Sequence, residues 1–534
     1  MTGEPPPRAP GTARRWEGSL AGIVSLALGL GVAQLVAGWW RDGDSPVISV
    51  GDWVIDNVPP TVKDWAIRTF GTNDKLALIV GTLALLTLVA AMLGRLARRH
   101  LGRALAGVAA IGIVGAAAAL SGPNASAASI LPSLVGSLAA GAALAWLSGW
   151  RPDTRREAQP EGATPTAWAA PAPSTMAVGP DRRTFLLSVS AIGAGAVIAG
   201  GVGQVLKRRY AVAGARRDLV LPPPVSVQGL PAGAELGVPG QPPFVTPNDD
   251  FYRIDTALLV PQVSPDRWRL RVHGLVEREL QLTFDELLRR PLVERTVTLS
   301  CVSNEVGGPL VGNAVWKGAL LADVLDEAGV DPRATQLLST SADGWTCGTP
   351  VAALLDGRDA LLAVGMNGEP LPIQHGFPVR MVVPGLYGYV SATKWVVDLK
   401  LTTWEDDVAY WVPRGWAREA PVKTMSRIDV PRHDSGLRPG PTAIAGVAWA
   451  PHRGISAVEV RVDDGPWEEA RLGAVPSEDS WVQWVLEWDA TEGDHVVTVR
   501  AVDGDGQLQP EQPAPPAPDG AQGWHRRHHR VRGS

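Results

Sequence analysis

The sequence predicts a helical membrane domain followed by two soluble domains, the first α+β and the second all-β. The first 206 residues contain apolar stretches close to the roughly 20 residues that a helix needs to cross a bilayer. Between 246 and 410, strand-like and helix-like segments alternate irregularly, and after 415 only short alternating strands remain. A chain of 534 residues is long enough for several such domains.

Five apolar stretches are expected to form transmembrane helices. The third and fourth come from one uncharged run, Ala104 to Trp150, which is too long for one helix and is divided by a turn at Ser121-Gly-Pro-Asn124. No histidine lies within the five stretches, so a haem held by paired histidines is not expected there. The predicted helices lie near residues 20–40, 76–94, 104–121, 128–149 and 186–206.

Basic residues predict the orientation of these helices. The amino terminus, the 95–103 loop and the 151–183 linker are basic and are expected on the cytoplasmic side. Five crossings then place the rest of the chain outside, although five basic residues between 207 and 217 oppose this. The stretch Asp181-Arg-Arg-Thr-Phe-Leu-Leu187 resembles a twin-arginine export signal, with an ordinary cytoplasmic flank as the alternative. Together these features predict an extracytoplasmic soluble part of a multi-pass cell-membrane protein.

Charge and cysteine content narrow the class of protein. The net charge is −5 and only 19% of residues are charged, which does not fit a nucleic-acid-binding surface. Two cysteines, Cys301 and Cys347, exclude a disulfide scaffold. Cys301 follows a β-type run, and three interpretations compete for it: a core side chain, half of a disulfide, or a reactive or metal-binding thiolate.

The soluble part divides at changes in composition. Residues 207–245 are a proline-rich lead-in, and residues 246–412 are the α+β domain, without a glycine-rich nucleotide loop. Within it, Arg269–His273 alternates as a strand, Thr283–Arg289 has a capping Thr and helical spacing, and Ala319–Ala328 is a second helix.

The last domain is predicted from alternating strands. Val458, Val460 and Val462 alternate with charged residues, and similar strands recur over residues 413–505, which suggests an immunoglobulin-like sandwich. Residues 506–534 are rich in proline and then basic, so they are expected to be a disordered tail. Its three histidines, His525, His528 and His529, offer a metal site as the less favoured alternative.

Four motifs occur in order ahead of the predicted sandwich: "TPNDDFYRIDT" at 246–256, "LSCVSNEVGG" at 299–308, "SADGW" at 341–345 and "LPIQHGFPVRMVVPGLYGYVSATKW" at 371–395. Together they resemble the sulfite oxidase family of molybdopterin enzymes, over about residues 220–505. The resemblance implies a Mo-molybdopterin cofactor, with Cys301 as the thiolate ligand of the metal. Catalytic roles are implied for Cys301 and Tyr387.

The resemblance also assigns the groups around the pterin. Arg380 and Lys394 match the positions that hold the cofactor phosphate, and His375 and Asp343 match positions that hydrogen-bond the pterin. Cys347 has no role in the family pattern and is expected to be a spare thiol. The full set of implied cofactor contacts is Asn248, Tyr252, Arg253, Asp343, His375, Arg380, Ser391 and Lys394.

The chain departs from the family at the positions that bind sulfite. Arginines are expected after Asn304, in the first motif and before the final lysine, but this chain has Glu305, Ile254 and Tyr389-Val390-Ser391 there. A dianion would be poorly held without guanidinium partners. Cofactor binding is therefore predicted, while the substrate and the direction of transfer stay open.

The resulting prediction is a membrane-tethered molybdenum oxidoreductase that transfers an oxygen atom to or from a small substrate. The sequence has no CxxCH haem motif, iron–sulfur cysteine set or flavin motif, so electrons would pass to a separate cytochrome or quinone-linked membrane protein. Three alternatives are an S-oxide or N-oxide reductase of the methionine-sulfoxide type in the same family, a cofactor-free binding or adhesion protein, and a thiol hydrolase using Cys301 and His375. The sandwich would support a homodimer.

Overall fold

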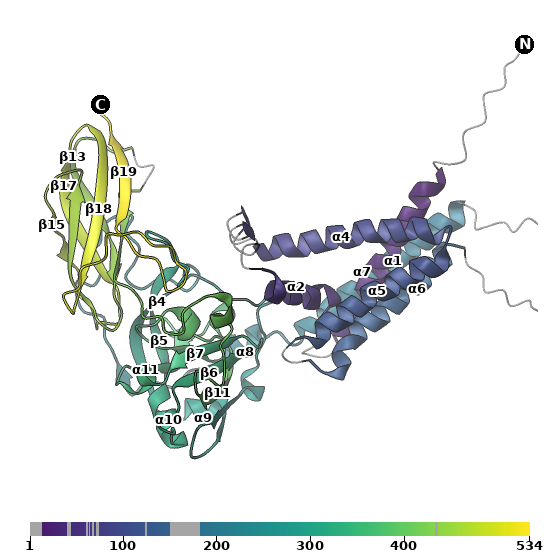
Figure 1. The fold of residues 1–534 in the computed structure, drawn as a ribbon, viewed down its shortest axis with the longest axis horizontal. Coiled ribbons are helices and arrows are strands. Elements are labelled where there is room, and N and C mark those ends of the chain that lie inside the picture. Colours follow the sequence, from purple (N-terminus) through teal and green to yellow (C-terminus); the bar gives the residue numbers. More distant parts are fainter. Residues whose placement is uncertain are drawn as a thin grey trace, which may run out of the picture. The chain divides into compact units, whose positions relative to one another are not determined.

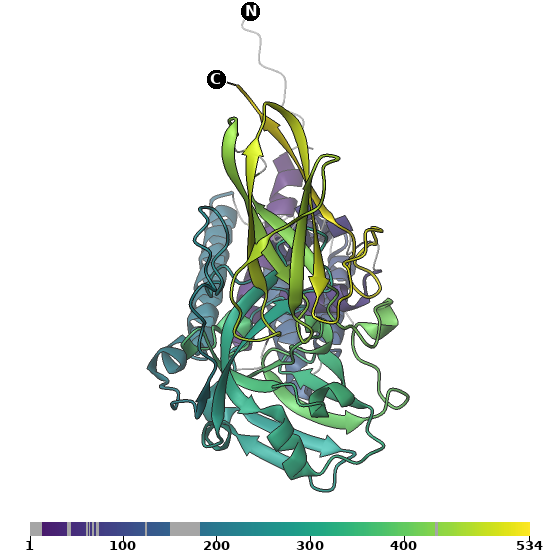
Figure 2. The same ribbon diagram turned by 90° about the vertical axis from the view of Figure 1, so that its left-hand side faces the viewer.

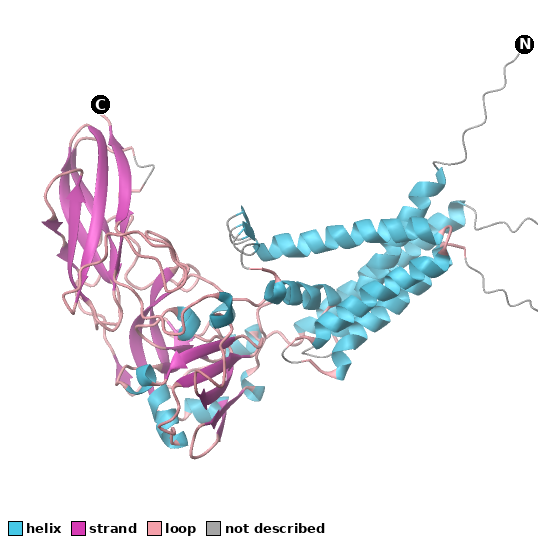
Figure 3. Cartoon of the chain, viewed as in Figure 1, coloured by secondary structure: helices cyan, strands magenta, loops and turns pink. Residues whose placement is uncertain are grey.

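The structure is a computed structural model, and its chain divides into two compact units, residues 1–211 and 212–534. The described residues are 13–39, 44–59, 62, 65–66, 69–70, 74–122, 125–149, 182–432 and 436–533. Most of the predicted 151–183 linker, including Asp181 of the proposed export motif, lies outside them, as do Pro123 and Asn124 of the predicted turn. Figure 3 shows that helices make up the first unit and that strands dominate the second.

Five helices of the first unit are long and apolar enough to cross a membrane, judged by length and composition. All five predicted stretches are therefore helical, with ends that differ by a few residues (Figure 1). No helix is predicted between residues 41 and 75, but α2 lies there, with Pro46 at its first position. The helices are α1 (Ala13–Ala37), α2 (Pro46–Asn57), α4 (Asp74–Ala97), α5 (Leu101–Leu120), η2 (Ala127–Ile130), α6 (Leu131–Leu147) and α7 (Arg182–Arg208).

Helix α1 contacts α4, α6 and α7, and small residues permit the close approach. A methyl group added at Gly22 of α1 would fall 1.9 Å from the carbonyl oxygen of Ala90 in α4. A methyl added at Gly38 would fall 2.4 Å from the carbonyl oxygen of Gly203 in α7. The glycine-rich composition of these segments thus serves helix packing.

The second unit begins with two mixed sheets. The larger sheet has the order β1-β4-β5-β8-β10, with β9 beside β8, and the smaller one has the order β3-β2-β11-β6-β7. The larger contains β1 (Ser226–Val227), β4 (Leu292–Ser300), β5 (Val311–Leu320), β8 (Leu361–Met366), β9 (Glu369–Pro370) and β10 (Arg380–Val382). The smaller contains β2 (Arg269–Gly274), β3 (Leu280–Thr283), β6 (Gln336–Ser341), β7 (Thr346–Pro350) and β11 (Val396–Thr402).

Short helices fill the connections of this β-rich domain. The predicted capping Thr is confirmed: Thr283 Oγ1 accepts the Glu286 N–H at 3.2 Å, and the Glu286 carboxylate accepts the Thr283 N–H at 2.8 Å. The second predicted helix begins later than expected, at Leu321, because Ala319 and Leu320 end β5. The helices are α8 (Ala213–Asp218), η3 (Pro265–Arg267), α9 (Phe284–Leu288), α10 (Leu321–Ala328), α11 (Ala352–Leu355), η4 (Ile373–His375), η5 (Gly388–Val390) and η6 (Val412–Arg414).

The central strands of the larger sheet are buried on both faces. In β8, Leu362 and Val364 join the apolar core shared with the smaller sheet, whereas Leu361 and Ala363 join a second core. Successive side chains of a strand point to opposite faces, so a continuous apolar run is needed here. Strand β4 is buried in the same way at its carboxyl end, and it leads directly to Cys301.

Two four-stranded sheets follow, and Figure 2 shows their strands. They enclose a common apolar core that includes Ile444, Val460 and Trp484. Their orders are β12-β13-β17-β16 and β15-β14-β18-β19. We refer to this pair as the sandwich. Its strands are β12 (Met425–Val430), β13 (Gly440–Trp449), β14 (Ile455–Val462), β15 (Glu468–Glu469), β16 (Arg471–Leu472), β17 (Val482–Ala490), β18 (Gly493–Asp503) and β19 (His525–Val531).

The expectation of a disordered tail after 506 is wrong. The basic stretch forms β19, which pairs antiparallel with β18 from His525 opposite Val499 to Val531 opposite Gly493 (Figure 1). His529 and Val531 are buried while Arg526 and Arg530 point to solvent. The basic composition hides this period-two pattern, and the free edge of β18 supplies the hydrogen bonds.

Candidate cofactor site

Cys301 begins the loop that follows β4. Its N–H donates to the Leu310 carbonyl at 2.9 Å and its carbonyl accepts the Asn304 N–H at 3.0 Å, so the backbone turns sharply at the thiol. Burial raises the pKa of this thiol, and hydrogen bonds from Ser303 only partly offset the effect. A thiol with a raised pKa is a poor nucleophile by itself but becomes a thiolate when it binds a metal cation.

The two cysteines do not form a disulfide. Both are free, and Cys347 is fully buried in β7, with its sulfur 3.8 Å from Thr349 Oγ1. Burial raises the pKa of the Cys347 thiol as well. Cys347 is therefore a core side chain, which leaves Cys301 available for another role.

Two tyrosines lie close enough to Cys301 to respond to its charge. Burial is the main cause that raises the pKa of Tyr252, and a Cys301 thiolate raises it further. Burial likewise raises the pKa of Tyr387 to about 12, with smaller contributions from Asp519 and Cys301. Both phenols therefore keep their protons at neutral pH. The Tyr387 hydroxyl accepts the Lys423 N–H at 3.4 Å, a contact made across to the sandwich side of the site.

Arg380 projects from β10 into the domain and is only 5% exposed. Its guanidinium lies 4.9 Å above the Trp316 ring and donates to backbone carbonyls, among them His375 at 3.1 Å and Ala392 at 3.4 Å. Among the described residues no carboxylate forms an ion pair with it. Burial lowers the pKa of Arg380 to about 10. A buried guanidinium without an anion is costly, so the site is built for a negatively charged group.

Two further cations surround one carboxylate beside Arg380. Lys394 Nζ and Arg253 Nε each lie 2.8 Å from Oδ2 of Asp255, whose side chain is 4% exposed. Burial is the main cause that lowers the pKa of Lys394 to about 8; Asp255 opposes this shift, and Arg380 and Arg253 add to it. Three cations against one carboxylate leave two positive charges in excess. We call Arg253, Asp255, Arg380 and Lys394 the basic pocket.

His375 is buried against the basic pocket. Its Nε2 lies 3.0 Å from the Asn248 carbonyl oxygen and donates to it, and its ring packs edge-on against Phe251. Burial lowers the pKa of His375 to about 4, and the nearby Arg380, Lys394 and Arg253 contribute in the same direction. The imidazole is therefore neutral at physiological pH, and the positive charges around it contribute to its low pKa.

The other predicted contacts are held by protein groups. Asn248 Nδ2 donates to Glu369 at 2.6 Å and its Oδ1 accepts from Asn367 at 2.8 Å. Ser391 donates to the Leu386 and Tyr387 carbonyls at 3.0 Å each. The Asp343 side chain accepts the Trp345 N–H at 3.1 Å and so shapes a turn. In the same turn the Ala342 N–H donates to the carbonyl of Trp395, the residue after Lys394. These side chains support the backbone around the site.

Sequence reasoning missed Asp255, which pairs with two of the predicted cations. The only signal was its position two residues after Arg253, and a pairing with the distant Lys394 is not visible in a sequence. It also missed Ser303, which hydrogen-bonds the Cys301 sulfur, and Trp316, which lies under Arg380. Glu305 and Ile254, at the positions where the resemblance leads us to expect arginines, are exposed.

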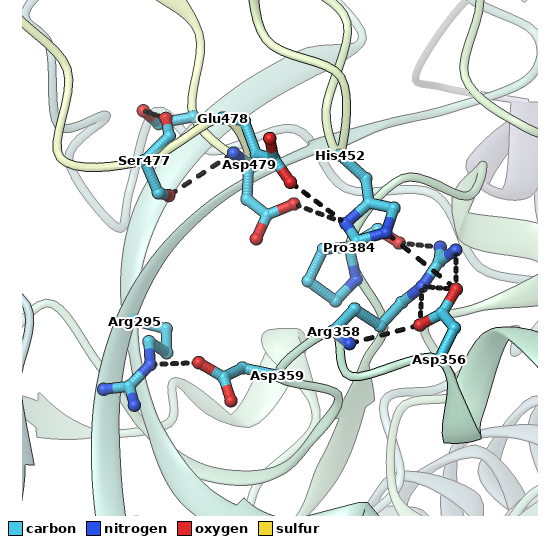
Figure 4. A network of polar contacts seen from close by, with 10 residues as sticks. Arg295, Asp356, Arg358, Asp359, Pro384, His452, Ser477, Glu478 and Asp479 are labelled. Atoms are coloured by element: carbon cyan, nitrogen blue, oxygen red, sulfur yellow. Dashed lines mark hydrogen bonds and ion pairs between the residues drawn. The ribbon is translucent and has the colours of Figure 1, made fainter.

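A separate charged cleft lies between the sandwich and the larger sheet, with a volume of about 380 Å³. His452 Nδ1 lies 3.6 Å from Asp479 and 3.7 Å from Glu478, and its Nε2 lies 3.9 Å from Asp356. Figure 4 shows the ring between these carboxylates. Each cation of this cleft has its own carboxylate: Arg295 pairs with Asp359, and Arg358 pairs with Asp356. No uncompensated cation is present among these residues, so the cleft offers no anion site.

The basic pocket and Cys301 together fit a cofactor that carries a phosphate and a metal. Guanidinium and ammonium groups with two charges in excess suit a phosphate dianion, and a thiolate suits a soft or redox-active metal. The fit rests on the orphan charge of buried Arg380 and on the thiol at the end of β4. A molybdopterin with bound molybdenum has both of these features.

Comparison with known proteins agrees with this chemistry. Residues 257–411 match the oxidoreductase molybdopterin binding domain. Sulfite oxidase of Gallus gallus is 31% identical over 324 residues, covering 51% of this chain and 69% of the relative. The chain belongs to the sulfite oxidase family. Its cofactor is therefore Mo-molybdopterin, and family members of this kind are molybdenum-dependent oxidoreductases.

Two more relatives extend the comparison. The mitochondrial sulfite oxidase of Rattus norvegicus is 31% identical over 321 residues, covering 51% of this chain and 58% of the relative. The uncharacterized oxidoreductase YuiH of Bacillus subtilis is 35% identical over 150 residues, covering 28% of this chain and 72% of the relative. The chain thus spans little more than half of the mammalian sulfite oxidase.

Proposed function

We propose that this sulfite oxidase family member is a membrane-tethered molybdenum oxidoreductase that transfers an oxygen atom to or from a small substrate. The observation that carries the proposal is the basic pocket, with its excess of positive charge and the buried, unpaired Arg380, in the same domain as the Cys301 thiol. Family membership supports the cofactor. When bound, molybdopterin supplies two-electron oxygen-atom transfer at the metal.

Each residue has a proposed part in holding the cofactor. The Cys301 thiolate would bind the metal, while Arg380, Lys394 and Arg253 would bind the phosphate. Neutral His375 would orient the pterin with its free ring edge, and Asn248, Asp343 and Ser391 would fix the surrounding backbone. The protonated hydroxyls of Tyr252 and Tyr387 would donate hydrogen bonds at the substrate oxygen.

Atoms and electrons balance in either direction. Oxidation takes the oxygen from water and releases two protons and two electrons, and reduction of an oxide consumes two protons and two electrons and releases water. The electrons would be exchanged with a separate cytochrome or quinone-linked membrane protein. The phenols of Tyr252 and Tyr387, whose pKa values respond to the charge of Cys301, would hold the protons nearest the proposed metal ligand.

A second candidate is reduction of an uncharged S-oxide or N-oxide, as in methionine-sulfoxide-type reductases of the same family. The specific observation is the exposed Glu305 and the 52% exposed Ile254 at positions where sulfite-binding arginines are expected. A carboxylate repels sulfite, whereas an uncharged oxide has no need of a guanidinium partner. This favours an uncharged substrate.

The proposal also covers membrane anchoring, the location of the soluble unit and the role of the sandwich. The five apolar helices support anchoring in the cell membrane, and the odd number of crossings supports a soluble unit on the extracytoplasmic side. An immunoglobulin-like classification of the sandwich, and its use in a homodimer, stay predictions. Size-exclusion chromatography with light scattering in detergent would show a dimer or contradict it.

Metal and pterin analysis tests the proposal. The full chain, expressed in a cofactor-replete host, should carry about one molybdenum per chain and release an oxidised pterin that fluoresces. Cys301→Ser should alter the molybdenum EPR signal and lose activity. Arg333→Ala is a matched control because that arginine is largely exposed and pairs only with Asp331. Neither molybdenum nor pterin in the wild type would favour a cofactor-free binding protein instead.

A further inference from the structure

Hydrogen bonds between its own residues close the base of the loop from Cys301 to Leu310. Cys301 N–H donates to the Leu310 carbonyl at 2.9 Å, and Leu310 N–H donates to the side-chain oxygen of buried Asn304 at 2.8 Å. Its tip carries two adjacent glycines, Gly307 and Gly308. Glycine pairs allow many backbone conformations, so the tip needs support from outside the loop to keep one of them.

That support comes from the sandwich. Nη1 of buried Arg427, in β12, donates to the Gly308 carbonyl at 2.9 Å. The ring of His525, the first residue of β19, covers Gly307: a methyl group built there would fall 2.4 Å from Nε2 and 2.5 Å from Cδ2 of the ring. Gly307 also has a φ of +76°, so both its backbone and its neighbour exclude a side chain.

His525 is itself held in one orientation. Its Nδ1 accepts the Ile428 N–H at 2.9 Å, so the neutral ring carries its proton on Nε2, the edge that faces Gly307. Burial, assisted by Arg527 and Arg427, lowers the pKa of His525 to about 4. The ring therefore stays neutral and keeps this tautomer throughout the physiological range.

We infer that His525 and Arg427 are positioning residues for Cys301, and that the carboxyl-terminal strand β19 thereby completes the metal-ligand loop. His525 packs against the loop tip at Gly307, and Arg427 donates a hydrogen bond to the carbonyl of Gly308. These contacts keep the loop in one conformation, and the Cys301 side chain at its base therefore keeps one orientation. The inference rests on the proposed function, because it assigns these residues a role toward Cys301 as the metal ligand. A ligand must be held closely to bind its metal well, and its supporting contacts matter as much as the ligand itself.

The two cysteines provide an internal test in the full-length protein without cofactor, purified in detergent from a host that cannot make molybdopterin. Cys301 is the reporter of the loop, and fully buried Cys347 is the reporter of global unfolding. The rate of alkylation by iodoacetamide at each cysteine, followed by peptide mass spectrometry, measures opening of the loop at Cys301 and global unfolding at Cys347. His525→Ala should raise the Cys301 rate about tenfold or more through local opening, with the Cys347 rate unchanged.

The matched control is His528→Ala. His528 lies on the same strand, opposite Val496, but its side chain is exposed. The control should leave the Cys301 rate at the wild-type value. Unchanged Cys301 labelling in His525→Ala, or a parallel rise at both cysteines, would overturn the inference, because the strand would then only stabilise the sandwich.

A double-mutant cycle separates the contact at Gly307 from general damage. Gly307→Ala alone should raise Cys301 labelling strongly, because its methyl collides with the His525 ring. In a His525→Ala background the collision is gone, so adding Gly307→Ala should raise the rate by a clearly smaller factor. Equal factors in both backgrounds would contradict direct coupling between the two residues.

The loaded enzyme gives a second readout. His525→Ala should shift the molybdenum EPR signal while the pterin content stays near the wild-type level, since the basic pocket is untouched. His528→Ala should leave the signal unchanged. Absence of molybdenum from the wild type would sink the proposed function, but the alkylation result would still decide whether His525 holds the Cys301 loop.

Discussion

The basic pocket and the charged cleft are two charged regions of the same unit, and they differ in how their charges are matched. In the basic pocket, Arg253 and Lys394 share the carboxylate of Asp255, and Arg380 has no carboxylate partner among the described residues. In the cleft, Arg295 and Arg358 each have a carboxylate of their own, and the groups left over are acidic (Figure 4). The cleft is a cavity of about 380 Å³, yet its cations are already paired, and only the basic pocket has a cation that lacks an anionic partner.

The comparison shows that charge imbalance marks this site better than cavity size does. A paired arginine is satisfied by its neighbour and gains little from a ligand. A buried, unpaired guanidinium such as Arg380 raises the free energy of the protein until an anion arrives. Burial, assisted by the charges of Arg380, Lys394 and Arg253, lowers the pKa of His375 to about 4, whereas burial in the cleft raises the pKa of Asp479 to about 6.

The largest expected effect comes from removing the unpaired charge. Arg380→Met should lower cofactor affinity by about 2–5 kcal/mol, because a buried charge–phosphate contact is lost. The same variant should stabilise the cofactor-free protein, since an uncompensated charge is replaced by an apolar chain. Molybdenum content and thermal unfolding of the cofactor-free protein measure the two effects.

Arg358→Met is the matched change in the cleft. It leaves Asp356 without its partner and should destabilise the protein while molybdenum content stays normal. Loss of cofactor from Arg358→Met, or destabilisation of the cofactor-free protein by Arg380→Met, would break the comparison.

Acid should affect the two regions in opposite directions. The folded pKa of His375, about 4, lies below its unfolded value near 6.5, so its contribution of on the order of 3 kcal/mol is present above pH 6.5 and is lost as pH falls toward 4. The folded pKa of Asp479 lies above its unfolded value, so its contribution is present at low pH and is lost as pH rises toward 6.

Asp479→Asn should therefore steepen the loss of stability between pH 6 and 4, and His375→Gln should flatten it. Denaturant unfolding as a function of pH measures both slopes. Bound cofactor phosphate would raise the pKa of His375 and protect the loaded protein from acid. Identical slopes in the wild type and both variants would show that neither group is perturbed by its region.

Inorganic phosphate should stabilise the protein through the basic pocket and not through the cleft, and this effect is expected to be smaller than the preceding ones. The cofactor-free protein should gain about 1.4 kcal/mol in inorganic phosphate at ten times its Kd, because the ion binds only the folded basic pocket. Arg380→Met should abolish this gain, and Arg358→Met should retain it. A gain that survives in Arg380→Met would place the anion site elsewhere.

The smallest effect is expected at the centre of the cleft. His452→Gln should change stability by less than about 1 kcal/mol at neutral pH, because its contacts of 3.6–3.9 Å are long and the ring is partly exposed. Thermal unfolding checks this, with molybdenum content unchanged. A large loss would make the cleft a structural centre of the unit.

Local patterns predicted much of the fold. The five apolar helices and the capping Thr283 depend on contacts within a few residues, so spacing and composition are enough to reveal them. Strand β19 was missed because the residues that alternate between its buried and exposed faces are mostly histidines and arginines, which do not give an apolar pattern. Its stability also depends on pairing with the edge of β18. Helix α2 was missed because it is short and amphipathic.

The candidate site shows the same division. The sequence by itself determined which residues to inspect: the motifs around Cys301, Arg380 and Lys394 resemble one family, and the match to residues 257–411 agrees. Only the tertiary structure decided that Asp255 pairs with both Arg253 and Lys394, and that His525, more than 200 residues after Cys301, covers its loop. Charge balance and loop support depend on distances between remote segments, and those distances are set by folding and not by sequence spacing.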